Sequence, residues 1–567
     1  MKHFKFLYFL IIFLIQFTVT AQTDFSIEKS GIVKTKKTDN TGFALKKPDG
    51  GVYVLVYNYK REIQYVNEFD SKMKLRKSTK IRATKDRIVS AVLENGKIKL
   101  FAVEVGRGLG KVLVVNFEKK NLEEIIEEAY DLDLDKKAIR KSVAKQDVDF
   151  NRVNEKKSNG DIDASLHTFT SDKENFTLIA TLHNYAKRGF TIFSDDRPRE
   201  TSTHTIIRLD EKLNVVDNKE VTLIHKDFKD FKLYKIDYFE DNDTYIFYGK
   251  GKKAKNKNRR KEDRELDLMG FETIYVLKGD QKPVMIKLQG EKDLLAVSKA
   301  LIIDNSISLA SLTFSRAYTE EDKIKTGLMV QEFHIQDLKQ KGVIINTELD
   351  DHSFKSYDFK SPSEGDLRKF DFHTMVKFQN DWVFGIYSYE VGTETMSFGS
   401  GQNVRRRFVS SERIKGDFNV FQLDSQNGEL IHHYTLKREI TRDRRDRIYN
   451  VGTYTNSGRF EFWNHGVFSK YREGKFNFIV NARELKKDTD TLTYVNSNLK
   501  SDKELLKSKP YLITLDLEKG FEYKPLLKTG TGLNGLMVEK MVKISDNEYI
   551  TNTPKPKEKS YVKITLD

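Results

Sequence analysis

Histidine and lysine recur at one aligned position of this 567-residue chain, and their side chains could perform chemistry. The position lies shortly before a polar turn in each of eight similar stretches. Its occupants are Gly42, Ile88, His167, Lys235, Ser298, His373, His465 and Lys540. Imidazole and ammonium groups that converge could bind an anion, or a metal ion if the histidines meet. In the alternative interpretation, polar residues at strand starts only hydrogen-bond to neighbouring strands.

Arginine and lysine are concentrated in three other segments. The arginines that we predict to bind anions are Arg259, Arg260, Arg405, Arg406, Arg407, Arg444 and Arg445. A guanidinium group can hold carboxylate, sulfate or phosphate through two parallel hydrogen bonds. The alternative is that these segments are only solvated loops, since blocks of like charge often stay unfolded.

The predicted ligand-binding ring therefore consists of His167, Lys235, His373, His465 and Lys540. No G-x-S-x-G, H-E-x-x-H or other nucleophile and base motif accompanies it. The 84 acidic residues offer no means of choosing a catalytic pair. We expect no catalytic residue, no bound metal and no cofactor.

The residues of the ring are positioned by hairpins that share one layout. Each has an alternating strand, a polar turn and a more apolar strand, which is the signature of a β-hairpin. The eight hairpins begin at Thr41, Arg87, Ser165, Lys232, Val297, Asp371, His465 and Val538. Seven are followed by a second strand pair, which begins at Ile63, Val112, Thr203, Thr273, Met329, Phe418 or Tyr511. One repeat is therefore four antiparallel strands.

Eight such repeats without a prominent helix resemble the β-propeller superfamily, in which four-stranded blades pack around a ring. We predict an all-β fold that forms a single propeller of eight blades, with seven as the alternative. The resemblance implies no site residue, because the Gly-His and Trp-Asp pairs of WD repeats and the sialidase box are absent. Only two tryptophans occur, Trp382 and Trp463, too few for tryptophan-docked blades. Trp382 is expected to pack between blades.

The last repeat, residues 538–567, has only three strands before the chain stops. Residues 25–34 alternate apolar and polar side chains, precede the first repeat and belong to no other blade. We predict that this strand completes the last blade and closes the ring, which removes an exposed sheet edge.

One face of the propeller should carry the long connections. If each blade runs from the centre outward, the links between strands two and three and those between blades share that face. The predicted long loops are 249–270, 391–416, 484–509 and 130–164. Because loops on a rigid scaffold commonly carry function, we expect the site on this face.

Residues 1–21 have the features of a secretory signal peptide, with Lys2 and Lys5 before an apolar run and small residues at its end. The mature chain, 22–567, is expected to form the propeller domain without a transmembrane segment. The sequence contains no cysteine, so we expect neither disulfides nor lipid attachment. Localisation in the periplasm, on the outer surface or outside the cell follows from export.

The 99 basic residues outnumber the 84 acidic ones, giving a net charge of +15, which favours anionic partners. In an exported protein, nucleic acid is not the expected partner. The interpretation that we favour is a non-enzymatic binding or scaffold protein of the cell envelope, which contacts an anionic polysaccharide or an envelope protein complex. The alternative is a glycan-active hydrolase or lyase with its site at the channel mouth.

Overall fold

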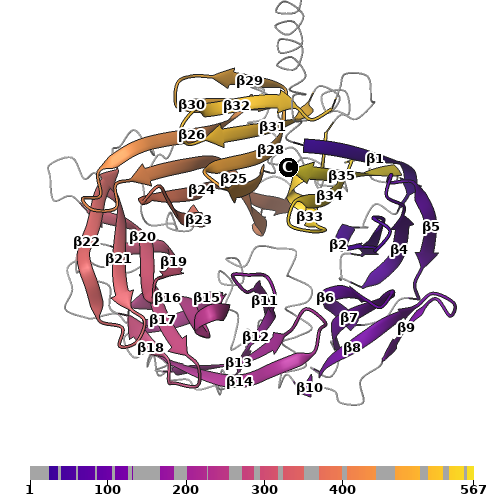
Figure 1. Ribbon diagram of the computed structural model, residues 1–567, viewed down its shortest axis with the longest axis horizontal. Coiled ribbons are helices and arrows are strands. Elements are labelled where there is room, and N and C mark those ends of the chain that lie inside the picture. The colour runs from indigo at the N-terminus through magenta and orange to yellow at the C-terminus, as the bar shows by residue number, and fades with distance from the viewer. Residues whose placement is uncertain are drawn as a thin grey trace, which may run out of the picture.

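The eight repeats form eight blades around a ring, as Figure 1 shows for the computed structural model. The described residues are 25–35, 40–58, 62–82, 86–104, 109–124, 130–131, 166–183, 201–225, 228–253, 271–286, 294–316, 324–349, 370–398, 405–441, 467–497, 508–527, 535–553 and 558–566. Neighbouring strands within the four-stranded blades are antiparallel. The predicted eight-bladed propeller is confirmed.

The two inner strands of each blade form its first hairpin. The innermost strands are β2 (Asn40–Lys46), β6 (Asp86–Glu94), β11 (Leu166–Thr170), β15 (Phe228–Phe239), β19 (Leu294–Ile303), β23 (Phe370–Phe378), β27 (Val467–Arg472) and β33 (Val542–Lys543). The second strands are β3 (Val52–Tyr57), β7 (Lys97–Glu104), β12 (Thr177–His183), β16 (Thr244–Lys253), β20 (Ser306–Arg316), β24 (Asp381–Phe398), β28 (Lys475–Ala482) and β34 (Glu548–Asn552).

The two outer strands follow in the same order. The third strands are β4 (Ile63–Phe69), β8 (Leu109–Asn116), β13 (Thr201–Leu209), β17 (Phe271–Lys278), β21 (Ile324–His334), β25 (Arg405–Leu423), β31 (Lys509–Asp516) and β35 (Glu558–Leu566). The outermost are β5 (Leu75–Lys80), β9 (Asn121–Glu124), β14 (Val215–Ile224), β18 (Val284–Ile286), β22 (Gln340–Leu349), β26 (Leu430–Thr441), β32 (Gly520–Pro525) and β1 (Phe25–Lys34). The short strand β10 (Tyr130–Asp131) pairs with β8.

The N-terminal strand β1 closes the last blade by pairing with β35, from Phe25 opposite Leu566 to Lys34 opposite Glu558. The ladder is irregular between Lys29 and Ile32, and there the Ser30 hydroxyl oxygen accepts a hydrogen bond from the Tyr561 N–H at 2.8 Å. The side chain thus replaces a backbone partner that the bulge removes. The predicted closure of the ring is confirmed.

The core consists of apolar layers between consecutive blades, because the second strands are covered on both faces. In β24, for example, Trp382 and Phe384 pack toward blade 5, whereas Val383 and Tyr387 pack toward blade 7. Burying each such side chain stabilises the fold by about 1.5–3 kcal/mol. The expectation that Trp382 packs between blades is confirmed, since it is 1% exposed.

Short turns close the blades at the face where strands one and two, and strands three and four, are joined. We call it the turn face. In two outer turns an aspartate, Asp70 or Asp210, accepts two backbone N–H bonds through Oδ1 at 2.8–3.0 Å. The following Met73 and Leu213 have φ of 57° and 65°, and their side chains are buried. These turns are locked by hydrogen bonds and apolar anchors together.

Two of the predicted long loops contain strands. Residues 391–416 were expected to be irregular, but β24 and β25 continue as a hairpin to the pair Phe398 and Arg405. Residues 484–509 likewise contain β29 (Glu484–Lys487) and β30 (Thr491–Ser497), and β30 pairs parallel to β26 of the neighbouring blade. These predictions were wrong because an adjoining ladder supplies hydrogen-bond partners that the charged sequence does not reveal. Residues 254–270 and 132–165, from the other two predicted loops, lie outside the described residues.

Candidate functional site

The innermost strands hold most of the aligned ring positions, but not all. Of the predicted ring, Lys235 lies on β15, His373 on β23 and His167 on β11, opposite Ala180. Lys540 was expected to begin a strand. Instead it ends the 3₁₀ turn η9 (Val538–Lys540), which precedes β33, and its N–H donates to the Met537 carbonyl at 2.9 Å. His465 lies outside the described residues.

The innermost strands share an irregularity near the positions of the ring. The ladders to the second strands shift register between Thr41 and Phe43, Ile88 and Ser90, Leu233 and Lys235, Leu295 and Val297, and Phe372 and Thr374. A bulge places an extra residue in one strand and redirects its side chain. His373 is itself the extra residue of its strand, so simple alternation cannot predict its surroundings.

His373 lies in the interface between blades 6 and 7. Its Nε2 is 2.9 Å from the Ser469 hydroxyl of β27, and its Nδ1 is 2.7 Å from the Thr374 hydroxyl. Tyr387 donates a hydrogen bond to Ser469 at 2.6 Å, and the rings of Tyr387 and Phe418 meet the imidazole edge-on. These contacts join two blades. The part of His373 in ligand binding remains a prediction.

Lys235 belongs to a polar cluster at the joint of blades 4 and 5. Its ammonium is 2.9 Å from the Asp237 carboxylate and lies 4.2 Å from the centre of the Tyr248 ring. The Tyr248 hydroxyl donates to Asp237 at 2.7 Å and accepts the Ala300 N–H at 2.9 Å. Tyr248 thus connects the ion pair to the innermost strand of the next blade.

The electrostatics of this cluster keep Asp237 ionised. Burial alone would raise the pKa of Asp237, but the positive charges of Lys235 and Lys299, with the Tyr248 hydrogen bond, outweigh burial and lower it. Burial and the neighbouring carboxylate raise the pKa of Tyr248 well above its ordinary value. The hydroxyl therefore stays protonated and able to donate.

Lys299 on β19 is half-buried, and its ammonium has no hydrogen bond or ion pair to the part of the chain that the structure describes. Burial lowers the pKa of Lys299, the charge of Lys235 lowers it further, and Asp237 and Asp371 oppose both. These four charged residues lie on β15, β19 and β23, so we call them the inner-wall cluster. An ammonium group in such a position can donate hydrogen bonds to a carboxylate or phosphate oxygen.

Only three of the seven arginines that we predicted to bind anions lie in the described part of the chain. Arg405, Arg406 and Arg407 lie on β25, opposite Phe398, Ser397 and Met396, at the distal end of the β24–β25 hairpin. They were expected in a loop, and that expectation was wrong. Arg259, Arg260, Arg444 and Arg445 lie outside the described residues.

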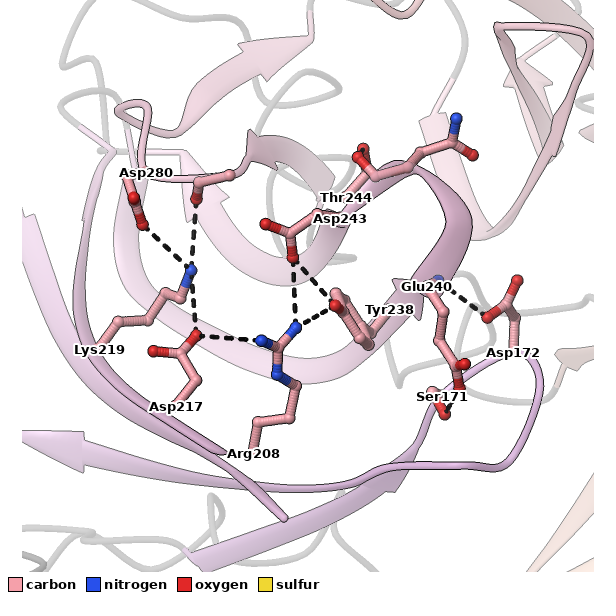
Figure 2. Close-up of polar contacts among 12 residues, drawn as sticks. Ser171, Asp172, Arg208, Asp217, Lys219, Tyr238, Glu240, Asp243, Thr244 and Asp280 are labelled. Atoms are coloured by element: carbon pink, nitrogen blue, oxygen red, sulfur yellow. Dashed lines mark hydrogen bonds and ion pairs between the residues drawn. The ribbon is translucent and has the colours of Figure 1, made fainter. Parts of the chain in front are cut away.

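The turn face carries a denser polar network, between blades 3 and 4 (Figure 2). Arg208 of β13 donates to the Tyr238 hydroxyl, and its guanidinium lies 3.3 Å from Asp243 and 3.9 Å from Asp217. The Tyr238 hydroxyl donates to Asp243 at 2.9 Å. Burial, followed by the Asp243 hydrogen bond, raises the pKa of Tyr238 to about 12. We call these contacts the Arg208 clamp.

Lys219 extends the clamp to the outer turn of blade 4. Its ammonium lies 3.2 Å from Asp217 and 3.6 Å from Asp280, and it donates to the Gly279 carbonyl at 3.3 Å. Figure 2 shows both cations of the clamp enclosed by acceptors from two blades. The network therefore pairs both cations with carboxylates, and among the described residues the buried Nε of Arg208 has no hydrogen-bond partner.

The inner turn of blade 3 reaches toward the middle of the ring, where Figure 1 shows β11. Asp172 accepts the Glu240 N–H at 3.1 Å, in the 3₁₀ turn η2 (Glu240–Asn242) of blade 4. Glu174 of the same turn forms an ion pair with Lys543 of β33, in the last blade. Contacts between blades 3 and 8 therefore cross the ring at the turn face.

Sequence reasoning missed most of the residues that the structure brings together here. Lys299 had a usable signal, since it is the one charged residue in the apolar strand Leu294–Ile303. Asp237 follows Lys235 by two positions, which places both on one face of a strand. Arg208 had no comparable signal, because its partners come from three separate strands and turns.

The described residues contain no group of three or more His, Asp or Glu side chains placed to hold a metal ion. Within the same residues, no helix is long and apolar enough to cross a membrane.

In comparisons with known proteins, the chain resembles solved structures only at low identity. No family model and no curated protein matches the chain. Among solved structures, the Dos1 propeller is 8% identical over 95% of this chain and 96% of its own, with a TM-score of 0.35. The polysaccharide lyase Uly1 is 11% identical over 84% and 90%, with a TM-score of 0.33. Dipeptidyl peptidase 4 of Porphyromonas gingivalis is 8% identical over 92% and 56%, with a TM-score of 0.35.

Proposed function

We propose that the protein is an exported, non-enzymatic binding or scaffold protein of the cell envelope. The face opposite the turn face, which we call the loop face, would contact an anionic polysaccharide or an envelope protein complex. The observation that supports this proposal most is a difference between the two faces in how their cations are paired with acidic side chains. The Arg208 clamp pairs its cations, whereas Lys299 has no partner among the described residues and Arg405–Arg407 lie at the end of a projecting hairpin.

Topology supports the choice of face. β16 ends at Lys253 and β17 begins at Phe271, both at the loop face, and the sequence between them contains Arg259 and Arg260. β26 ends at Thr441 and β27 begins at Val467, also at the loop face, and the sequence between them contains Arg444 and Arg445. The net charge of +15 strengthens attraction to polyanions at low salt.

The alternative, a glycan-active hydrolase or lyase, has less support from the described carboxylates. A glycosidase needs one carboxyl group with a raised pKa to act as the general acid. Asp237, the carboxylate best placed on the inner wall, is ion-paired with Lys235, and its pKa is lowered. We therefore do not propose a hydrolytic function.

The test is retention of the full chain on an immobilised sulfated polysaccharide. Replacing Arg405, Arg406 and Arg407 with Ser should make the protein elute at clearly lower salt, because fewer counterions are released on binding. The matched control replaces Lys72, Lys212 and Lys519 with Ser. These three exposed lysines lie in turns of the turn face, and their replacement removes the same charge. Equal elution of the arginine variant and the wild type would refute the proposal.

A further inference from the structure

The closing strand β1 has little apolar packing compared with its partner β35. Of the ten residues of β1, only Ser30 and Val33 are buried, and Ile32 is 65% exposed. Seven of the nine residues of β35 are buried. β1 pairs with β35 alone, and the bulge near Ser30 interrupts that ladder. The attachment of β1 therefore depends on its polar contacts as well as on its apolar ones.

Four charged side chains connect β1 to the rest of the last blade and to blade 1 at the turn face. Lys563 of β35 is directly opposite Glu28 of β1, and its ammonium lies 3.3 Å from Glu28 Oε1. The same ammonium is 3.6 Å from Oε1 of Glu548, the first residue of β34. The other oxygen of Glu548 is 2.5 Å from the ammonium of Lys46, at the end of β2. We call Glu28, Lys46, Glu548 and Lys563 the closure network.

Lys563 is the member of the closure network that depends most on its partners. Its side chain is 8% exposed, whereas that of Lys46 is 49% exposed and remains in contact with water. A buried cation costs free energy unless opposite charges lie beside it. Glu28 can supply this charge through Oε1 only, since its Oε2 is buried without a hydrogen-bond partner in the described part of the chain. Loss of charge on either carboxylate would therefore leave Lys563 with one partner.

The surroundings of Glu548 favour its charged form. Burial alone would raise the pKa of Glu548, but hydrogen bonds from Lys46 and Ser545 and the charges of Lys46 and Lys563 outweigh burial and lower it. A carboxylate with a lowered pKa in the folded state contributes stability that is complete above the unfolded value of 4.5. That stability is lost as the pH falls through the lowered value.

We propose that the closure network makes the closing of the ring sensitive to acid. When its carboxylates are protonated, the buried ammonium of Lys563 loses the opposite charges, and β1 separates from β35 while the other blades stay folded. β1 can separate alone, because it is the outermost strand of its blade and only one ladder is broken. Lys543 and Asp546, the charged residues of the adjacent turn, lie 2.9 Å from each other. The inference goes beyond the proposed function, since no residue of the loop face takes part.

The first test is hydrogen exchange of the full chain, followed by mass spectrometry from pH 7 to about pH 3.5 and corrected for intrinsic exchange rates. The internal reference is β14 of blade 3, which is also an outermost strand of ten residues. The protection of β1 should fall at least tenfold more than that of β14. Equal losses would overturn the proposal, because acid would then act on all blades alike.

The second test uses Glu548→Gln, which imitates the protonated carboxyl group at pH 7. The protection of β1 should fall at least tenfold at pH 7, with a smaller further loss in acid than in the wild type. The matched control is Glu558→Gln, which removes an exposed carboxylate of β35 outside the closure network and should change the protection less than twofold. If β1 in Glu548→Gln were as protected as in the wild type, the network would have no such role.

The third test separates the release of β1 from a change in the whole blade. Ser26 and Thr565 are directly opposite each other in the closing ladder, which places their Cα atoms about 4.5–5.5 Å apart, within the range of a disulfide. The chain contains no cysteine, so Ser26→Cys combined with Thr565→Cys introduces a single bridge. The oxidised variant should keep β1 protected in acid, and reduction should restore the loss. An oxidised variant that loses protection in acid as the wild type does would contradict the proposal.

Discussion

The Arg208 clamp and the inner-wall cluster both lie beside blade 4, yet they differ in how many acceptors surround their cations. In the clamp, Arg208 and Lys219 are surrounded by three aspartates, a hydroxyl and a carbonyl from two blades. On the inner wall, Lys235 has one carboxylate, and Lys299 has no partner among the described residues. Both regions use the same residue types, so composition does not separate them.

This difference distinguishes two uses of a buried cation. Burying a charged side chain costs free energy unless an opposite charge and hydrogen-bonding groups of the protein replace the lost water. The clamp supplies those acceptors and holds two blades together. The described part of the inner wall supplies no hydrogen-bonded acceptor for Lys299.

The largest expected effect is on the clamp. Replacing Arg208 with Met keeps the apolar stem, which lies beside the Phe176 and Tyr238 rings, but leaves Asp217 and Asp243 with Lys219 as the nearest cation of the clamp. We expect a loss of about 2–4 kcal/mol in the free energy of unfolding. Denaturant unfolding would measure it.

The control for this variant is Arg76→Met, which removes an exposed arginine 2.7 Å from Asp70. Exposed pairs contribute little, so its unfolding should hardly change. Similar losses in both variants would show that the clamp is no more than a surface ion pair.

The next largest effect is expected at Lys299, where a substitution should stabilise the fold instead of destabilising it. The lowered pKa of Lys299 means that the folded state releases this proton at lower pH than the unfolded state, whose pKa is near 10.5. Stability is therefore reduced while Lys299 is charged, and it recovers as the pH rises from the lowered pKa toward 10.5. Lys299→Met should stabilise the protein at pH 7, by about 1 kcal/mol, with a smaller gain at pH 10.5.

Thermal melts of both proteins across this pH range would test the sign. Lys235→Met is the matched control, because it removes the partner of Asp237 and should destabilise at pH 7. A destabilising Lys299→Met would mean that its ammonium is satisfied in the fold, and the contrast with the clamp would disappear.

The smallest effect is expected where blades 3 and 8 meet across the ring. Glu174 and Lys543 remain 45% and 35% exposed, so water and salt screen their attraction. A double-mutant cycle with Glu174→Gln and Lys543→Gln should give a coupling energy of about 0.5 kcal/mol, lower still in 1 M salt. A coupling above about 2 kcal/mol would instead make this pair a structural element comparable to the clamp.

Much of the fold could be predicted because its signals are local. The polar turns of the hairpins contain asparagine or glycine at Asn95, Asn305, Asn380 and Gly474, where φ is positive, a conformation that these two residue types tolerate best. Strand alternation identified β1 and its place in the last blade. The extension of the β24–β25 hairpin was missed, because the charged residues Arg405–Arg407 indicated a loop. These arginines belong to a ladder that begins at the buried residue Trp382, which the local sequence does not reveal.

The candidate site could be predicted only in outline. Alignment placed Lys235 and His373 on innermost strands, but the partner of His373, Ser469, is 96 residues away in the next blade. The bulges at these strand positions interrupt the alternation on which the prediction depended. Asp237, Lys299 and Arg208 received no role until their neighbours were known.

From the sequence, eight blades were predicted, with seven as the alternative, together with the strand order and the closing strand, since turn conformation and alternation are properties of a few adjacent residues. Only the tertiary structure decided which charges are paired. Pairing depends on which face each bulged strand presents and on side chains from neighbouring blades. Arg208 is therefore paired with carboxylates, whereas Lys299 has no such partner among the described residues.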